Sequence, residues 1–355
     1  MLERFKTSYD RDIDFVQSRR QLTGLAAGAV AACALPFLVG EYWLAQLNFI
    51  YIYSIVGLGM MLLTGYTGLL SLGNAAFMGL GAYAEAALAA RGVPIVVSLP
   101  LAVLLAAGAG VVVGLPAIRV KGIYLGMATL AFNFLLEEAL ARWTSVTGGN
   151  SGKTVPPISW FGNEADSPTV LYFLCLLLLI GSTLFILNIL RSPTGRAFIA
   201  IRDAEVSAQS MGIDLAYYKT LSFCISAGMA GLGGALYAHQ LQFLSPDQFS
   251  LIRSIDLVLM IVVGGMGSIP GAFLGAAFLI GMPQAIAMAK DFLPSAVANA
   301  SGLQTLVYGL ILGAFVLLEP RGIYGRWSKC RDWFALRPFY RTHGSTRLFQ
   351  RSERL

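Results

Sequence analysis

Long apolar runs, separated by short polar connections, extend over most of the chain. A helix needs about 20 apolar residues to cross the hydrocarbon core of a bilayer, and runs of this length recur along the sequence. The pattern therefore predicts an all-α polytopic membrane protein with about ten transmembrane helices. Their expected ranges are 22–40, 44–63, 67–90, 95–115, 122–141, 170–190, 220–238, 255–265, 271–289 and 302–319.

Two of these runs mark the extremes of the pattern. The run at 170–190 contains no charged residue and gives the clearest prediction of a transmembrane helix. The run at 255–265 is too short to span a bilayer. It crosses only if it recruits Leu251 and Ile252, or else it enters the membrane as a broken helix.

Composition supports the same fold class. Of the 355 residues, 56% are hydrophobic and only 12% are charged, and the mean hydropathy is +0.69. Soluble globular domains are about 25% charged, so an ordinary soluble enzyme and a disordered chain are both excluded. We expect one transmembrane domain over 22–319, between an N-terminal cytoplasmic tail at 1–21 and a basic C-terminal cytoplasmic tail at 320–355.

The basic residues predict which side of the membrane each connection occupies. With ten helices, 20 of the 25 lysines and arginines fall on one side, in the two tails and the connections at 116–121 and 191–219. Cytoplasmic connections are the ones enriched in Lys and Arg. Both termini are therefore expected in the cytoplasm, and the net charge of +6 indicates topology and lipid contact rather than nucleic-acid binding. The opposite side holds Arg91, Arg142, Lys153, Arg253 and Lys290.

Few ionisable residues lie inside the predicted helices. They do not form a series across the membrane, as a proton relay would require. His239 lies at a helix end, so a metal site is not expected, and the segment 148–154 has the wrong spacing for a phosphate-binding loop. We therefore expect no cofactor in this chain and a source of energy outside it. The residues concerned are Glu85, Glu137, Glu138, Asp256 and Glu319.

Glycine pairs four residues apart recur in the predicted helices. Examples are Gly110 with Gly114 and Gly309 with Gly313. In lipid such pairs let helices approach closely, so tight packing of the bundle is their expected role.

Two glycine-rich segments, at 64–74 and 264–271, interrupt the apolar pattern. Irregular backbone at membrane depth occurs where it is buried in protein or lines a water-filled cavity, and transporters often bind substrate at such breaks. An equal alternative is that both segments are tight turns on the cytoplasmic side. The candidate residues of a translocation pathway are Thr67, Ser71, Asn74, Gly264, Gly265 and Gly267.

The segment 191–219 is the substantial internal connection on the cytoplasmic side. Ser192-Pro193 predicts a helix start, and Gly212 predicts a left-handed helix end. An amphipathic helix between them would either lie on lipid or fill a groove of a cytoplasmic partner. The acidic Asp203 and Glu205 favour the partner. The predicted apolar stripe consists of Ile201, Ala204, Ala208 and Met211.

Several segments together resemble the LivM-type permease family, the membrane subunits of branched-chain amino acid ABC importers. The resemblance extends over 44–326. The segments are GYTGLLSLGNAAFMGLGAY (65–83), RVKGIYLGMATLAF (119–132), TGGNSG (147–152), SPTGRAFIAIRDAEVSAQSMGIDLAYYK (192–219), SAGMAGLGGALYA (226–238), GGMGSIPGAFLGA (264–276) and EPRGIYGRW (319–327).

The resemblance implies roles for two of these segments. The segment 192–219 would be the coupling loop that docks on ATPase subunits, through Gly195, Arg196, Arg202, Asp203, Glu205, Ala208 and Gly212. The outer loop would face a binding protein through Gly148, Gly149 and Asn150. In that loop the chain has Asn150-Ser151-Gly152, where the family commonly has Ser-Asp-Gly or Thr-Asp-Gly.

By the same resemblance the chain would be a multi-pass permease subunit of the bacterial inner membrane and not an enzyme. It would carry branched-chain or related amino acids delivered by an extracytoplasmic solute-binding protein. A second homologous permease and two ATP-binding cassette subunits, which bind ATP and Mg, would complete the complex. The alternatives are a urea, short-amide or aromatic-acid permease of the same family, or an ion-coupled secondary transporter or channel.

Overall fold

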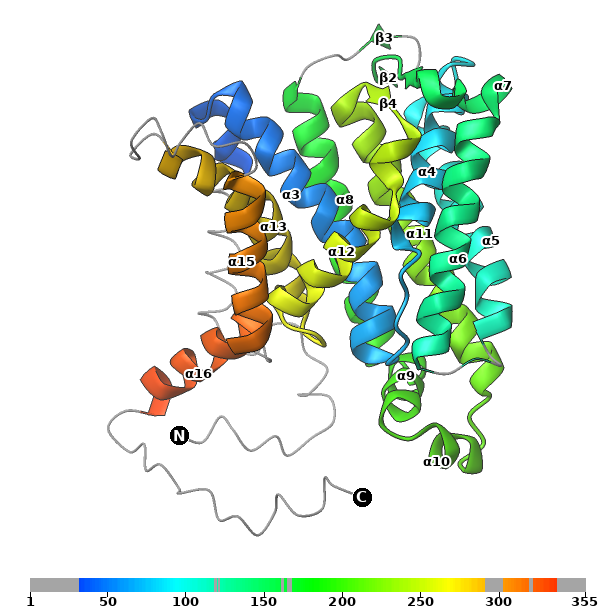
Figure 1. The fold of residues 1–355 in the computed structure, drawn as a ribbon, viewed down its shortest axis with the longest axis vertical. Coiled ribbons are helices and arrows are strands. Elements are labelled where there is room, and N and C mark those ends of the chain that lie inside the picture. Colours follow the sequence, from blue (N-terminus) through cyan, green and yellow to red (C-terminus); the bar gives the residue numbers. More distant parts are fainter. Residues whose placement is uncertain are drawn as a thin grey trace.

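The computed structural model describes residues 32–117, 120, 122–160, 163–164, 168–290, 303–318 and 322–336. These residues form a bundle of helices with short strands at one end (Figure 1). Six of the described helices have the length and apolar composition needed to cross a membrane. They are α3 (Glu41–Met60) with its π-helical continuation η2 (Met61–Tyr66), α5 (Ile95–Ala117), α6 (Ile123–Arg142), α8 (Pro168–Arg191), α11 (Leu215–Leu241) and α13 (Ile269–Lys290).

Shorter elements complete the described part of the chain. Strand β1 pairs antiparallel with β4, and β2 pairs antiparallel with β3. The shorter helices are α4 (Asn74–Ala89), α7 (Thr144–Thr147), α9 (Pro193–Asp203), α10 (Glu205–Ser210), α12 (Leu251–Gly264), α15 (Leu303–Leu318) and α16 (Gly322–Leu336), with 3-10 turns η3 (Gly149–Ser151) and η4 (Pro246–Phe249). The strands are β1 (Lys153–Thr154), β2 (Ser159–Trp160), β3 (Asn163–Glu164) and β4 (Phe243–Leu244).

The apolar pattern predicted the long helices correctly. The runs at 44–63, 95–115, 122–141, 170–190, 220–238 and 271–289 each correspond to one of them. The run at 302–319 corresponds to α15, and α16 follows within what was predicted as a tail. Of the predicted helix 22–40 the structure describes 32–40, in which residues 32–38 are helical.

Two predicted helices are shorter than a membrane span. The prediction of a helix over 67–90 was wrong for its first seven residues, because 67–73 is not helical and α4 begins only at Asn74. Gly68, at φ +75°, takes a left-handed conformation that is incompatible with a continuous helix. The run at 255–265 does recruit Leu251 and Ile252, and α12 then ends before Gly265.

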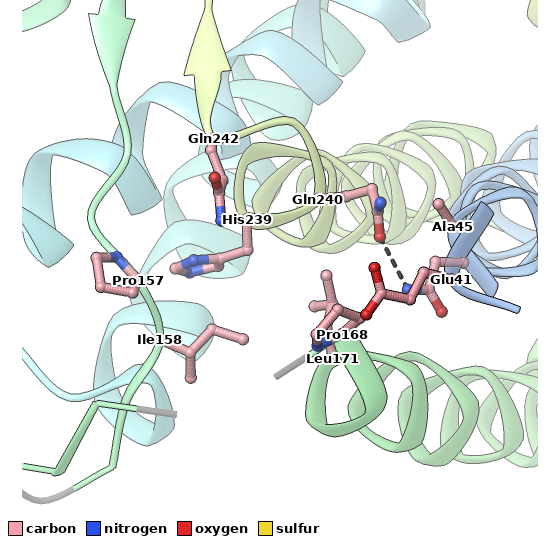
Figure 2. Close-up of a pocket in the computed structure, with 10 residues that line it drawn as sticks. Glu41, Ala45, Pro157, Ile158, Pro168, Leu171, His239, Gln240 and Gln242 are labelled. Carbon is pink, nitrogen blue, oxygen red and sulfur yellow. Dashed lines mark hydrogen bonds between the residues drawn. The ribbon is translucent and has the colours of Figure 1, made fainter. Parts of the chain in front are cut away.

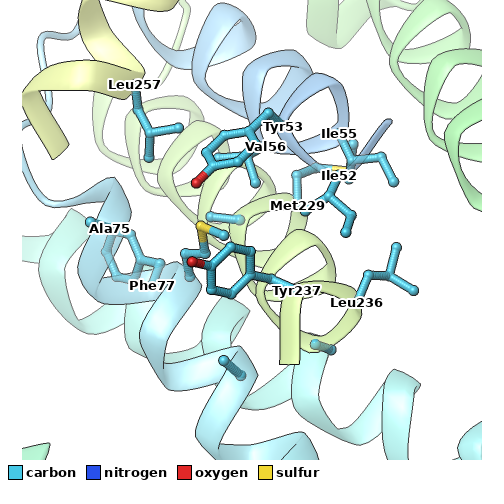
Figure 3. Close-up of a cluster of buried hydrophobic side chains, with 14 of the residues drawn as sticks. Ile52, Tyr53, Ile55, Val56, Ala75, Phe77, Met229, Leu236, Tyr237 and Leu257 are labelled. Carbon is cyan, nitrogen blue, oxygen red and sulfur yellow. The ribbon is translucent and has the colours of Figure 1, made fainter. Parts of the chain in front are cut away.

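Helix α11 packs against α3, α4 and α5 at the centre of the bundle. A Cβ atom at Gly231, Gly233 or Gly234 would collide with α5, α3 or α4, respectively. We call these three positions the glycine seam. Close approach of helices gains dispersion contacts, which stabilise helix association in lipid. Figure 3 shows large buried side chains of the core between these helices, among them Tyr53 and Tyr237.

The predicted glycine pairs have two different outcomes. Gly110 and Gly114 of α5 pack closely against α11, as expected. For Gly309 and Gly313 of α15, no heavy atom of the described residues lies within 4 Å of an added Cβ, so the close packing expected of that pair is not seen in the described part of the chain. Small residues permit a close approach, but a neighbouring helix must be present to use it.

The outward faces of α5, α6 and α8 are apolar. Such surfaces are stable against lipid tails, whereas in water they would form an unusually large exposed apolar patch. The exposed side chains include Leu104, Leu105, Val112, Leu135, Leu177 and Ile180.

The segment 191–219, predicted to be cytoplasmic, forms two short helices, α9 and α10, where one was predicted. Ala204 takes an extended conformation between them, with φ −161° and ψ 100°. Pro193 starts α9 and Gly212 has φ +85°, as predicted. Because the break turns the second helix, Ile201 and Ala208 are buried while Ala204 and Met211 are exposed. The single apolar stripe was therefore wrong.

Candidate functional site

Helix α4 begins near the middle of the bundle rather than at its end (Figure 1). The backbone N–H of Ala75 donates to Oγ of Ser254 on α12 at 3.1 Å, and that of Ala76 donates to Oδ1 of Asn133 on α6 at 3.0 Å. Asn133 lies near the centre of α6, which also places this helix start at mid-depth. The first N–H groups of a helix carry a partial positive charge, so this point attracts polar and anionic groups.

Polar side chains from three helices surround this start, and we call Asn74, Thr129, Asn133 and Ser254 the mid-depth network. Ser254 Oγ donates to Asn133 Oδ1 at 3.1 Å, and Thr129 Oγ1 accepts from the N–H of Leu72 at 2.9 Å. Both polar side-chain atoms of Asn74 and Nδ2 of Asn133 are buried without a partner. A buried polar atom without a partner lowers the stability of the fold by about 1–3 kcal/mol. A polar ligand at this point would therefore gain hydrogen bonds.

The other two polar residues predicted near this break shape the backbone. Thr67 Oγ1 donates to the carbonyl of Leu62 at 3.0 Å. Ser71 Oγ accepts from the N–H of Gly73 at 3.3 Å. Both side chains are buried. Of the three residues, Asn74 is the one whose side-chain nitrogen and oxygen both lack a partner.

A charged pair lies at the same depth on α12. Arg253 was assigned to the outer side, but it occupies the first turn of α12 with its guanidinium 5.9 Å from the ring centroid of Tyr53. Tyr53 lies in the middle of the span formed by α3 and η2, so that assignment was wrong. Arg253 Nη1 lies 3.9 Å from Asp256 Oδ2, and the two side chains are 34% and 26% exposed. Charges at this depth rarely face lipid and usually border a pathway or a protein contact.

The two glycine-rich segments meet at the end of the bundle that carries α9. A Cβ at Gly65 would lie 2.6 Å from the backbone nitrogen of Gly267. Gly265 (φ +117°) and Gly267 (φ +79°) form a tight turn between α12 and α13, and Gly264 packs directly against α13. Arg202 Nη1 donates to the carbonyl of Gly65 at 3.1 Å. Segment 264–271 is thus a tight turn, whereas 64–74 leads from this end to mid-depth.

Glu205 of the predicted coupling loop is engaged by the central helix. Lys219 Nζ on α11 lies 2.6 Å from Glu205 Oε1. The lysine side chain is 1% exposed and the glutamate side chain is 22% exposed. This largely buried ion pair fixes α10 against α11.

The remaining predicted coupling residues are either packed or exposed. Gly195 and Ala208 are buried, and Gly195 lies against the backbone at the end of α8. Arg202 pairs with Asp203 at 3.0 Å on the surface. The exposed members are Arg196, Arg202, Asp203 and Gly212.

Two apolar side chains of this loop are exposed. Val206 on α10 is 73% exposed and Met211 just after it is 84% exposed. Scattered exposed apolar residues are normal, but two of them at the tip of a projecting loop suit contact with another protein (Figure 1). The sequence prediction assigned Met211 to the apolar stripe offered to lipid or to a partner, and it did not single out Val206.

The predicted outer loop lies at the end of the bundle opposite α9 and α10, beside the strands (Figure 1). Gly148 (φ +75°) and Gly149 (φ +61°) form its turn, and Asn150 is exposed. Lys153 Nζ donates to the carbonyl of Val146 at 2.7 Å, and burial together with nearby Arg91 lowers the pKa of Lys153. The loop is held by its own backbone, and Asn150 is exposed.

Sequence reasoning missed part of the mid-depth site. Thr129 and Asn133 are four residues apart and therefore share one face of α6, which was an available signal. Ser254 and Arg253 gave no such signal, because their depth depends on where α12 begins.

Comparison with known proteins identifies relatives over most of the chain. Residues 42–317 match the family described as branched-chain amino acid transport system / permease component. The chain is 34% identical over 315 residues to the high-affinity branched-chain amino acid transport system permease protein LivM of Escherichia coli, covering 81% of this chain and 73% of the relative. It is 25% identical to BraD of Pseudomonas aeruginosa, with the same transport description, over 77% of this chain and 92% of the relative. No solved structure matches.

Proposed function

The chain belongs to the branched-chain amino acid transport permease family, and from this premise we propose that it forms the LivM-type half of an ABC importer pathway for branched-chain or related amino acids. One observation carries the proposal: the coupling loop bonds directly to the broken segment, through Arg202 Nη1 and the carbonyl of Gly65. The chain from Gly65 leads to Asn74 in the mid-depth network. A displacement of α9 by a partner therefore acts on the polar site with few intervening residues.

The charges at mid-depth favour an amino acid over urea or a neutral amide. An amino acid carries a carboxylate for Arg253 and an ammonium group for Asp256, whose ion pair at 3.9 Å is too long for a hydrogen bond. The amides of Asn74 and Asn133 offer further hydrogen bonds. A zwitterion therefore satisfies more of this site than an uncharged substrate does.

Energy enters in this proposal through partner subunits. Two ATP-binding cassette subunits, which hold ATP and Mg, dock on the coupling loops of this chain and of a second homologous permease. Val206 and Met211 provide the apolar contact, and the exposed Arg196, Arg202 and Asp203 provide charge. A solute-binding protein delivers substrate at the outer loop near Asn150. We place the complex in the bacterial inner membrane, with ten helices in this chain and both termini in the cytoplasm.

Reconstitution of the complete complex in liposomes tests this function. Uptake of leucine, urea and benzoate is measured with ATP, and again with hydrolysis-deficient ATPase subunits. We expect leucine uptake that requires hydrolysis. Uptake that continues without hydrolysis would contradict the ABC mechanism, and uptake of urea or benzoate instead of leucine would contradict the substrate.

The docking contact has its own test in retention of the ATPase by the purified chain. Val206→Asp and Met211→Asp place a charge at the apolar contact and are expected to reduce retention at least tenfold. Ser151→Asp introduces the same charge in the outer loop, where Ser151 is exposed, and serves as the matched control. Equal retention by all three variants would show that α10 is not the docking surface.

A further inference from the structure

Helix α16 presents an outward-facing surface at the end of the bundle that carries α9 (Figure 1). At the opposite end, the polar side chains of Glu41, His239 and Gln240 line a cavity of about 150 Å³ between helices (Figure 2). On α16, by contrast, the large side chains of Trp327 and Trp333 are 65% and 39% exposed. They extend away from the core of the bundle, toward whatever surrounds it.

The exposed side chains among the described ones of α16 share one side of the helix. Arg326, Cys330 and Trp333 follow one another at spacings of four and three residues, which is one row on a helix surface. Trp327 lies three positions before Cys330, and Lys329 lies four positions before Trp333, so both border this row. All five residues are exposed. One side of α16 therefore combines two indole rings with two basic groups.

This combination suits the headgroup layer of a membrane. An indole ring joins a large apolar surface to one N–H donor, and Trp is enriched at the boundary between hydrocarbon and water. Arg and Lys at that boundary rest their aliphatic stems on apolar surface and direct their charged ends to the water side. There they form charge-assisted hydrogen bonds with phosphate groups.

Helix α16 begins where the lipid-facing surface of α15 ends. Leu317 and Leu318, the last two residues of α15, are 84% and 77% exposed. The apolar surface therefore continues to the end of α15, and α16 starts only four positions after Leu318, at Gly322. The polar headgroup layer borders the hydrocarbon core directly, so a helix that starts at this point lies at headgroup level.

The beginning of α16 is fixed on the turn between α12 and α13. A Cβ atom at Gly322 would lie 2.6 Å from the backbone nitrogen of Gly265, and Gly322 has φ +66°. This left-handed conformation, which suits glycine, lets the chain change direction after α15. Helix α16 contacts α12 and α13, and it leads outward from the lower end of α15 (Figure 1).

The charge of α16 indicates which lipids it contacts. Its sequence contains Arg326, Lys329 and Arg331 against one acidic residue, Asp332. Each Lys or Arg near an anionic membrane surface strengthens attachment by about fivefold. The balance on α16 is thus the opposite of that between α9 and α10, where the acidic pair Asp203 and Glu205 suits a protein partner.

We propose that α16 is a membrane-surface helix that binds anionic phospholipid headgroups. Arg326 and Lys329 contact the phosphates, and the rings of Trp327 and Trp333 lie at the boundary with the acyl chains. Because Gly322 packs on Gly265, the helix also ties the α12–α13 turn to the bilayer surface. The inference concerns the lipid and not the transported solute, so it does not depend on the proposed function.

Hydrogen–deuterium exchange of the full chain in nanodiscs tests this binding. One set of nanodiscs contains phosphatidylcholine alone, and the other contains equal parts of phosphatidylcholine and phosphatidylglycerol. We expect the amides of 322–336 to exchange at least about tenfold more slowly in the anionic nanodiscs, with no difference for α11. The slowing should decrease at high salt, because salt screens the attraction.

A double variant tests the two basic groups. Arg326→Gln/Lys329→Gln removes two charges, each worth about fivefold, and should leave a slowing of less than about threefold. Arg91→Gln/Arg142→Gln removes two exposed basic residues from the opposite end of the bundle and is the matched control. It should show the wild-type slowing at 322–336.

Two outcomes would overturn the proposal: equal exchange of 322–336 by the wild-type chain in both nanodiscs, or full slowing in Arg326→Gln/Lys329→Gln. The comparison of lipids uses the wild-type chain and stays valid if the variant fails to fold. Purified ATPase subunits are added to nanodiscs of phosphatidylcholine alone as a third arm. Protection of 322–336 by these subunits, without any slowing by phosphatidylglycerol, would show that α16 is a protein-binding surface instead.

Discussion

Replacing Glu205 with Gln is expected to release α10 from the central helix. Lys219 is 1% exposed and its Nζ lies 2.6 Å from Glu205 Oε1, so the substitution leaves a buried ammonium group without its countercharge. Breaking a buried ion pair costs about 3–5 kcal/mol. Because Glu205 is 22% exposed, water already solvates part of the pair, and we expect a loss at the lower end, about 3 kcal/mol. This corresponds to a more than 100-fold change in the docking equilibrium, since every 1.4 kcal/mol is about tenfold.

Hydrogen–deuterium exchange of the purified chain measures this equilibrium locally. Amides of 205–214 should exchange faster by about the same factor, while peptides from α6 remain unchanged. The double variant Glu205→Gln/Lys219→Met removes both charges and should restore most of the protection, because no buried charge remains unpaired.

Glu138→Gln provides the control, because it breaks the exposed pair of Glu138 with Arg142 on α6. Exposed pairs contribute about 0.2–1 kcal/mol, so exchange should change little. Wild-type exchange at 205–214 in Glu205→Gln would refute the reasoning. Exchange as fast in the double variant as in the single one would show that the lost carboxylate, and not the stranded lysine charge, is responsible.

Three further predictions concern the glycines and the mid-depth network. Gly234→Ala should destabilise the bundle by about 1–3 kcal/mol, because the added methyl meets the backbone of α4, whereas Gly228→Ala on the same helix has 3.4 Å of room and should be neutral in thermal unfolding. Gly267→Ala forces an L-residue to φ +79° at about 1–2 kcal/mol and should lower uptake by the reconstituted complex more than ATPase retention. Asn133→Leu removes the acceptor of the Ala76 N–H and should reduce uptake at least tenfold with normal expression, so wild-type uptake would exclude this network from the pathway.

The long helices were predictable because each is a local pattern. An uncharged run such as 170–190 has one way to satisfy its backbone in lipid, which is to form a helix. The break at Ala204 was not predictable in this way. Alanine favours helix, so the extended conformation there comes from tertiary packing, in which Glu205 is held by Lys219 fourteen residues later in the chain.

Individual residues of the candidate site were predictable from the sequence, but the contacts that bring them together were not. Asn74 and the two glycine-rich segments stood out because they interrupt apolar runs. That Arg202 bonds to Gly65, or that Ser254 reaches the start of α4, depends on contacts between residues more than a hundred positions apart. Glu85 and His239 were each noted as isolated ionisable residues, and the fold makes them a pair.

Helix α11 has a mechanical consequence that follows from the glycine seam. Its 27 residues extend about 40 Å at 1.5 Å per residue, with Lys219 near one end and His239 near the other. The close contacts at these glycines leave little room for α11 to slide past α3, α4 and α5. We therefore expect the four helices to move as one rigid unit, so that a displacement at Lys219 also moves the end of the bundle that carries His239. A displacement transmitted through a rigid unit of this kind requires no series of charged residues along the helix.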